Sequence, residues 1–193
     1  MNKGRLEAFS DGVLAILITI MVLELRVPHG QDLLSLKPLI PVFISYILSF
    51  LYLGIYWNNH HHMLHTVKHV SGGILWANLY LLFWLSLIPF ITNWVGETNF
   101  APVPISLYGV NLLMAAIAYY ILQIQILKKH GHDSLLARAI GDDLKGKMSP
   151  ILYFSAILLS FINQWIALGI YALVALIWLI PDKRIERLFE EER

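Results

Sequence analysis

The sequence has no cysteine, and charged residues make up only 14% of its 193 residues. Without cysteine, the chain can form no disulfide, no thioether haem attachment and no thiolate metal site. The low charge, together with 58% apolar residues and a mean hydropathy of +0.64, excludes an ordinary soluble domain. A net charge of only +1 leaves no basic surface for nucleic acid. The composition is that of an integral membrane protein.

Six apolar segments are suited to cross a bilayer as helices. A helical span needs about 20 residues, and these segments are continuous, without the alternation of apolar and polar residues that marks strands. The uncharged run over residues 149–181 is too long for one span, and Asn163 and Gln164 would divide it into two short helices. We expect an all-α membrane protein with spans at residues 6–25, 37–57, 72–95, 103–127, 149–163 and 166–181.

Lysine and arginine are unevenly distributed over the connecting segments. If the N-terminus is cytoplasmic, twelve of the fourteen basic residues fall on the cytoplasmic side, and only Arg26 and Lys37 fall outside. Because cytoplasmic loops carry the excess of basic residues, both termini are predicted to be cytoplasmic. Residues 128–148 form the only sizeable polar segment, and a short amphipathic helix is expected around residues 134–140.

Three ionisable residues, Arg5, Glu7 and Asp11, open the first apolar segment. A charge near the middle of a bilayer costs about 2.5–3.5 kcal/mol on the most lenient scale, so these side chains should face protein, water or one another. Arg5 and Asp11 are six residues apart, which is a poor spacing for a pair within one helix. Their partners should therefore lie on other helices, and the candidates are Trp57, His60, His61 and Asn78.

We interpret Arg5, Asp11 and these candidate partners as a structural hydrogen-bonded network that holds the first helix. The alternative is a proton-sensitive latch, because a histidine beside arginine and aspartate can titrate near neutral pH.

Ile16, Ile20 and Leu23 fall on one face of the first helix, one and two turns apart. Apolar side chains at this spacing usually pack against neighbouring helices. Charged residues beyond both ends of the segment favour a second interpretation, a narrow apolar passage with a charged mouth on each side. At the outer end Glu24 could attract cations, although a pair with Arg26 is the simpler expectation.

The N-terminal half of the chain carries rare polar residues in an order that resembles a known family. On the first helix the series is Arg5, Phe9, Ser10, Asp11, Gly12, Val13, Ala15, Ile16 and Thr19. Further along the chain the resemblance extends to Trp57, His60, His61, Asn78 and Pro89. Both series are similar to the signature of the endosomal and lysosomal potassium channel family known as transmembrane protein 175. The last three spans add only their number and order.

The resemblance implies a potassium-preferring cation channel and no enzyme. A chain with one six-helix repeat resembles the prokaryotic branch of the family, in which four copies assemble with their first helices around the pore. Residues 1–193 would be a single six-helix channel domain of a homotetramer in a prokaryotic cell membrane. Lipid and permeant potassium ions would be its other partners, and it would need no cofactor.

The resemblance also assigns roles on the first helix. Ile16, Ile20 and Leu23 would form the pore constriction, and Thr19 would contribute to ion discrimination. However, a threonine in a helix commonly bonds the carbonyl one turn back, here that of Ala15, and would then be silent. The chain has no TVGYG segment whose carbonyl oxygens could replace the ion's water. An apolar ring can gate only by dewetting, and we expect it to favour potassium moderately, because potassium holds its water less tightly than sodium.

Parts of the sequence are also compatible with two other classes of function. A proton-coupled secondary transporter could use Asp11 and Arg5 as a relay. Transporters usually show internal repeats and helices broken at mid-membrane, whereas the first helix is unbroken after Gly12.

A metal-dependent membrane enzyme could use His61, His65 and His69, whose spacing is compatible with one helical face. This is the weaker alternative, because the cluster stands alone and has no carboxylate near it in the sequence.

Overall fold

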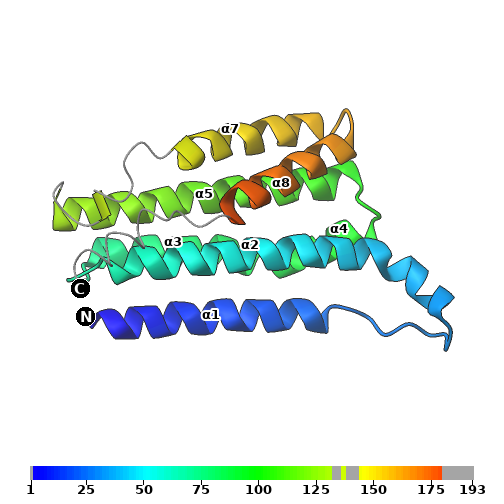
Figure 1. Ribbon diagram of the computed structural model, residues 1–193, viewed down its shortest axis with the longest axis horizontal. Coiled ribbons are helices and arrows are strands. Elements are labelled where there is room, and N and C mark those ends of the chain that lie inside the picture. Colours follow the sequence, from blue (N-terminus) through cyan, green and yellow to red (C-terminus); the bar gives the residue numbers. More distant parts are fainter. Residues whose placement is uncertain (1, 132–135, 138–143, 180–193) are drawn as a thin grey trace.

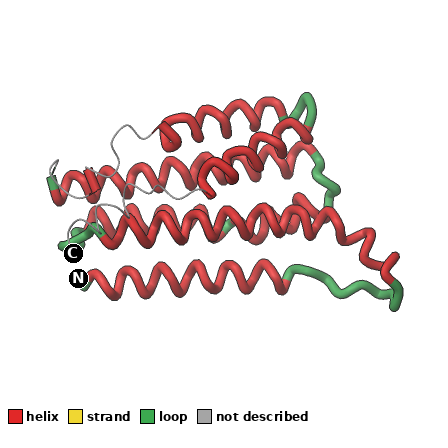
Figure 2. Tube along the Cα trace, viewed as in Figure 1, coloured by secondary structure: helices red, strands yellow, loops and turns green. Residues whose placement is uncertain are grey.

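The computed structural model describes residues 2–131, 136–137 and 144–179. In these residues, helices cross the molecule six times along one long axis, each pass opposite in direction to the one before, and no strand occurs (Figures 1 and 2). A short 3-10 helix, η1 (Leu33–Leu39), leads into the second pass. The passes are α1 (Lys3–Leu23), α2 (Ile40–His65), α3 with α4 (Gly72–Ser86 and Ile88–Glu97), α5 (Pro102–His130), α7 (Leu144–Leu159) and α8 (Gln164–Leu179).

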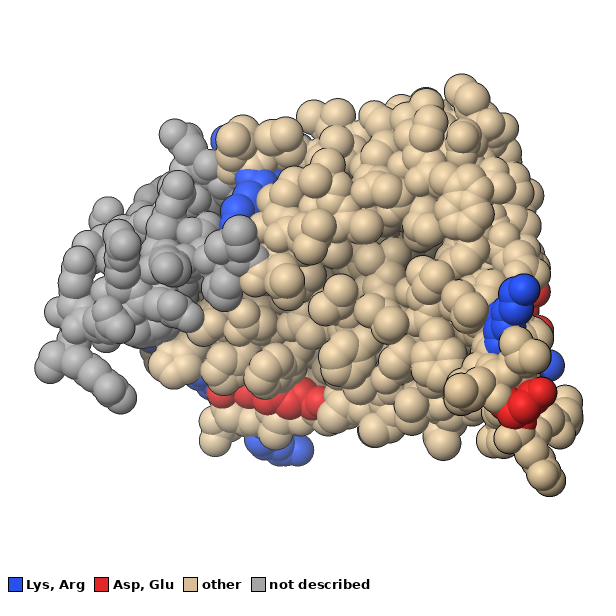
Figure 3. Space-filling model, turned by 45° about the vertical axis from the view of Figure 1, so that its right-hand side comes forward, with Lys and Arg blue, Asp and Glu red and all other residues tan. Residues whose placement is uncertain are grey.

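The helices agree with the predicted all-α membrane class. Four stretches are long and apolar enough to cross a membrane: Lys3–Leu23, Leu33–His65, Gly72–Glu97 and Pro102–His130. The last two passes, α7 and α8, have 16 residues each, or about 24 Å, and are the two short helices predicted. Figure 3 shows the corresponding surface, because the charged side chains of the described residues gather toward the ends of the face in view and leave an uncharged band between.

The turn between α7 and α8 lies where the polar pair was expected to divide the long apolar run. Asn163 precedes α8, and its side-chain oxygen accepts a hydrogen bond from the backbone N–H of Trp165 at 2.9 Å. This is an N-cap, which satisfies one of the free amides at the start of a helix. The amphipathic helix expected around residues 134–140 lies for the most part outside the described residues.

The third pass is not the single helix predicted for residues 72–95. Helix α3 ends at Ser86 and α4 begins at Ile88, with Pro89 at its second position. Proline has no N–H to donate to the carbonyl of Leu85, and its ring crowds that carbonyl, so a continuous helix is interrupted here. The third span is therefore divided at Pro89, where hydropathy alone predicts a continuous helix.

The six passes form a bundle in which α1 lies at one edge (Figure 1). Helices α2, α3 and α4 lie between α1 and the group made of α5, α7 and α8. Close packing in that group depends on small residues: a Cβ at Gly109 would overlap the hydroxyl of Tyr171, which donates to the Ile105 carbonyl at 3.2 Å. The bundle therefore buries α5 deeply and leaves α1 covered on one side only.

Candidate functional site

Helix α1 has one buried face and one exposed face. The buried face packs against α2, α3 and α4 and consists of Leu6, Ser10, Leu14, Leu17 and Met21. The opposite face carries the residues predicted to form the constriction: Ile16, Ile20 and Leu23 are 58%, 39% and 80% exposed. Phe9 lies on the exposed side as well, at 52%. In the single chain the predicted constriction residues are thus unpacked, so they do not serve as core of their own bundle.

A buried chain of hydrogen bonds joins α1 to α3 and α2. The Ser10 hydroxyl donates to the Leu6 carbonyl at 2.9 Å and accepts from the Asn78 side-chain nitrogen at 3.0 Å. The Asn78 oxygen lies 2.7 Å from His60 Nε2. Because the serine proton is already used, Asn78 must donate to Ser10, and its oxygen must accept from His60. His60 therefore carries its proton on Nε2 in this arrangement, and three helices are joined by one directed chain.

Asp11 makes a separate contact to α2. The indole nitrogen of Trp57 donates to Asp11 Oδ1 at 3.1 Å, and the Trp57 ring stacks on His61 with centroids 6.1 Å apart. Asp11 is half-buried, so its carboxylate meets a donor near the start of the apolar segment. The structure thus brings Ser10, Asp11, Trp57, His60, His61 and Asn78 together in two adjoining groups.

Arg5 does not join either group. Its side chain is exposed and makes no hydrogen bond or ion pair with any residue that the structure describes. The partner expected for Arg5 on another helix of the same chain is therefore not found.

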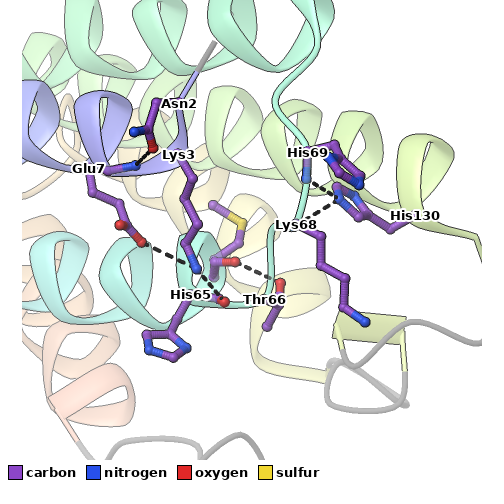
Figure 4. Close-up of polar contacts among 10 residues, drawn as sticks. Asn2, Lys3, Glu7, His65, Thr66, Lys68, His69 and His130 are labelled. Atoms are coloured by element: carbon purple, nitrogen blue, oxygen red, sulfur yellow. Dashed lines mark hydrogen bonds and ion pairs between the residues drawn. The ribbon is translucent and has the colours of Figure 1, made fainter.

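Lys3, one residue that the sequence analysis did not single out, fixes the start of α1 instead. Its Nζ lies 3.7 Å from Glu7 Oε1 and donates to the His65 carbonyl at the end of α2 at 2.7 Å (Figure 4). Lysine and glutamate four residues apart on a helix commonly form an ion pair, so the contact between Lys3 and Glu7 could have been predicted from the sequence. The hydrogen bond from Lys3 to the His65 carbonyl could not have been predicted, because every residue has a backbone carbonyl and the sequence does not indicate which one is bound.

The histidine cluster does not form the face required for a metal site. Helix α2 ends at His65, and Thr66 closes it by donating to the Met63 carbonyl at 2.7 Å, so His69 lies beyond the helix. Across the described ranges, no group of three or more histidine, aspartate or glutamate side chains is placed to hold a metal ion. The prediction that His61, His65 and His69 share one helical face was wrong, because residues at i, i+4 and i+8 lie on one face only while the helix continues. His60, the first histidine of the run, is buried.

The turn after α2 is instead tied to the end of α5. The backbone N–H groups of Lys68 and His69 both donate to His130 Nε2, at 3.1 and 3.2 Å (Figure 4). Because Nε2 accepts, the other ring nitrogen, 3.0 Å from the Ile126 carbonyl, carries the proton.

At the outer end of α1, the expected pair between Glu24 and Arg26 is wrong. Glu24 accepts from the Asn93 side chain at 3.2 Å, and Arg26 Nε lies 3.5 Å from Glu97 Oε1. Asn93 and Glu97 are one turn apart on α4, so they present both partners on one face. The chain leaves its helix after Leu23, and Glu24 and Arg26 therefore meet α4 separately.

Thr19 is exposed on α1, and its hydroxyl donates to the carbonyl of Ile16 at 2.8 Å. The bond goes three residues back, to Ile16 and not to Ala15. Because the hydroxyl proton is directed at the helix backbone, the oxygen lone pairs are left facing away from it. The exposed face of α1 therefore holds one side-chain oxygen among its apolar residues.

Comparisons with known proteins agree with this arrangement. The family model of the endosomal/lysosomal potassium channel TMEM175 matches residues 5–89, a range that contains the residues on which the resemblance rests. A potassium channel of Chryseobacterium sp. (strain P1-3) is 59% identical over 191 residues, covering 99% of this chain and 100% of that protein. The human endosomal/lysosomal proton channel TMEM175 is 36% identical over 81 residues, covering 35% of this chain and 16% of that protein.

The fold has a close counterpart among solved structures. The crystal structure of a lysosomal potassium-selective channel TMEM175 homolog from Chamaesiphon minutus superposes with a TM-score of 0.82 at 30% sequence identity. The match covers 93% of this chain and 97% of that one, so the similarity of fold extends over nearly the whole of both chains. These relatives are named as channels and not as enzymes. The chain belongs to the endosomal/lysosomal potassium channel family TMEM175.

Proposed function

We propose that the protein is a potassium-preferring cation channel, formed by four copies of the chain around a pore lined by α1. Residues 1–193 form its single channel domain, both termini are cytoplasmic, and the channel lies in the cell membrane of a prokaryote. The names of the bacterial relatives support potassium as the permeant ion. The observation that carries the proposal is the exposed face of α1.

That face has the spacing of a helix seam. The exposed residues Arg5, Phe9, Gly12, Ile16, Thr19 and Leu23 follow one another at intervals of four, three, four, three and four. A repeat of 3.5 residues keeps one stripe of side chains facing neighbouring helices over the length of a bundle. A helix in contact with lipid alone needs no such repeat. The exposed stripe therefore favours contact between copies of α1 around a common axis.

Small residues lie in this seam and beside it. Ala8, Gly12 and Ala15 are exposed along the same side of α1, and a Cβ placed at Gly12 would meet nothing within 4 Å in its own chain. Helices in membranes approach most closely where such residues lie, because packing between backbones replaces the missing hydrophobic force. The fold of one subunit therefore does not require a glycine at position 12. Its small size would instead allow the α1 helix of a second copy to approach closely.

In a tetramer, Ile16, Ile20 and Leu23 would make successive apolar rings along the axis. Such rings hold no ligand for an ion, so passage depends on whether water fills them, and a dry ring closes the pore. The oxygen of Thr19 would lie between the rings of Ile16 and Leu23, with its lone pairs free to meet a passing cation. Selectivity would then combine the cost of removing water with one weak oxygen ligand per subunit.

A proton-coupled transporter is the second candidate, favoured by one observation: Asp11 is a half-buried carboxylate bonded to Trp57. Transporters usually bind ions where helices are broken at mid-membrane. Helix α1, which carries Asp11, is continuous from Lys3 to Leu23, and the broken pass is α3 with α4. The geometry therefore supports the channel better.

The deciding experiment is ion flux through the purified protein in liposomes. With potassium or sodium on one side and the voltage clamped, a channel gives passive flux of both ions, with potassium faster. Protein-free liposomes of the same lipid are the control. Flux that appears only when a proton gradient is imposed, and that stops when the gradient is removed, would reject the channel in favour of the transporter.

A further inference from the structure

A cavity of about 60 Å³ lies between α2, α5, α7 and α8, and α1 contributes no residue to it. Space of this size holds several water molecules or a group of a few non-hydrogen atoms. Its wall is mainly aromatic, made of Tyr52, Tyr56, Tyr119, Tyr120, Tyr153 and Trp178. The cavity is therefore separate from the proposed pore, which lies on the other side of the bundle.

Most of the polar groups in the wall are already hydrogen-bonded. The Tyr52 hydroxyl donates to the Tyr171 carbonyl at 2.7 Å and accepts from Tyr153 at 3.3 Å. The Trp178 indole donates to Ser149 at 2.8 Å, and the Tyr119 hydroxyl donates to a backbone carbonyl at 3.2 Å. These bonds hold the wall in place and leave those groups with little to offer a ligand.

Two wall residues differ from the rest. Tyr56 and Gln123 are each only 8% exposed, yet neither the hydroxyl nor the amide has a hydrogen-bond partner within the part of the chain that the structure describes. Neither the Tyr56 hydroxyl nor the Gln123 amide is fully enclosed by protein. Both side chains line the same cavity, from α2 and from α5. A group bound in the cavity can therefore form a hydrogen bond with each of them.

The chemistry of the wall limits what that group can be. Among the lining residues that the structure describes there is no lysine, arginine, histidine, aspartate or glutamate, so these residues offer no counter-ion to a charged ligand. The tyrosine hydroxyl and the amide can each donate and accept, which suits a ligand group that also does both. A hydroxyl is the smallest uncharged organic group of this kind, and aromatic rings pack well on the carbon atoms that carry it.

We propose that this cavity binds the hydroxyl end of an uncharged alcohol, held by Tyr56 and Gln123. The alcohol is either a small free molecule or the head of a neutral lipid. Tyr120 lines the cavity from α5 and is 61% exposed, so this side chain lies between the cavity and the outer surface of the bundle. A lipid chain attached to the hydroxyl can leave at that point.

The test uses the full-length protein in nanodiscs of phosphatidylcholine. The free-alcohol probe is 2,2,2-trifluoroethanol, followed by fluorine NMR, and the lipid probe is monoolein, followed by native mass spectrometry. Saturable binding of trifluoroethanol alone identifies a small alcohol as the ligand. Monoolein that is retained and that displaces trifluoroethanol identifies a lipid head. If neither probe binds saturably, the cavity holds water only and the proposal is rejected.

Four substitutions, one of them a control, then locate the bound probe. Tyr56→Phe and Gln123→Leu should each weaken binding about five-fold, which corresponds to one hydrogen bond. Tyr46→Phe is the matched control, since Tyr46 is on α2 but does not line the cavity, and it should leave binding unchanged. Ala116→Leu fills the cavity without removing a polar group and should abolish binding. Binding that survives Tyr56→Phe, Gln123→Leu and Ala116→Leu would mean that the probe lies elsewhere, and would overturn the proposal.

Discussion

Trp57 Nε1 donates to Asp11 Oδ1 at 3.1 Å, and the residue before Asp11 bonds in a different direction, because Ser10 accepts from Asn78. Successive residues of a helix point about 100° apart, so Asp11 reaches α2 while Ser10 reaches α3. Helix α1 cannot rotate about its axis without breaking one of these contacts. The two anchors together fix which face of α1 packs on its own chain and which face is left for other copies.

Removing the donor at Trp57 should therefore loosen α1. We expect Trp57→Phe to reduce tetramer yield, because a hydrogen bond to a charged group contributes about 1.5–3 kcal/mol to stability. The partial exposure of Asp11 makes the contribution of this bond smaller. Tetramer yield from size-exclusion chromatography and potassium flux in liposomes are measured on the same preparation. Trp94→Phe, at the other end of the bundle, is the control. Normal assembly with loss of proton-coupled transport alone would instead support a relay at Asp11.

The seam on α1 predicts a specific effect at Gly12. Gly12→Leu should keep the fold of the single chain, since a side chain there meets nothing within 4 Å, but should block the tetramer. Gly169→Leu is a matched control, because Gly169 is an exposed glycine of α8 with equally open surroundings. Native mass spectrometry in detergent reports the assembly. A stable tetramer of Gly12→Leu, or a stable monomer of the unchanged protein, would show that copies of α1 do not pack along this stripe.

The apolar rings predict what a polar side chain at Ile16 does. Ile16→Asn should wet the ring, raise single-channel conductance and lower the potassium-to-sodium permeability ratio. Ile16→Leu is the control: it keeps the ring apolar and should leave both the conductance and the permeability ratio unchanged. Both are measured in planar bilayers under mixed potassium and sodium. Unchanged conductance and selectivity in Ile16→Asn would place the gate at another level of the pore.

Thr19 provides a test of the one oxygen on the exposed face. Thr19→Val preserves the shape of the side chain but removes the hydroxyl that donates to Ile16. If the lone pairs meet the permeant ion, the potassium preference should fall, and the reversal potential in mixed salts should shift toward that of a non-selective pore. Identical reversal potentials for Thr19→Val and the unchanged protein would leave the hydroxyl with only its backbone bond.

The buried chain of hydrogen bonds through Asn78 predicts that replacing Asn78 destabilises the protein, whereas replacing a second buried asparagine, Asn111, does not. Asn78→Leu leaves the Nε2 proton of His60 without an acceptor, which should lower the free energy of unfolding by about 1–3 kcal/mol. Asn111 is the matched control, because it is 2% exposed and its amide has no hydrogen-bond partner in the described structure. Asn111→Leu should be neutral or stabilising. Thermal unfolding in detergent compares the two, and equal losses would show that the hydrogen bonds of Asn78 add nothing.

The sequence by itself determined the class of the protein, the number of passes and the hairpin at Asn163. These depend on hydropathy and on local capping, and both are properties of neighbouring residues. It also indicated that Trp57, His60 and Asn78 would meet the start of the first helix. That prediction came from the order of the spans, since the second and third spans meet at the side of the membrane where the first helix begins.

Only the tertiary structure decided which side of α1 is covered, because hydrophobic residues occur all around that helix and its apolar periodicity does not select a face. The same holds for Arg26, which pairs with Glu97 and not with its near neighbour Glu24. It holds too for Arg5, whose side chain finds no partner among the described residues of its own chain. The physical reason is that burial and pairing depend on how distant segments pack, whereas hydropathy and helix capping act within a few residues of chain.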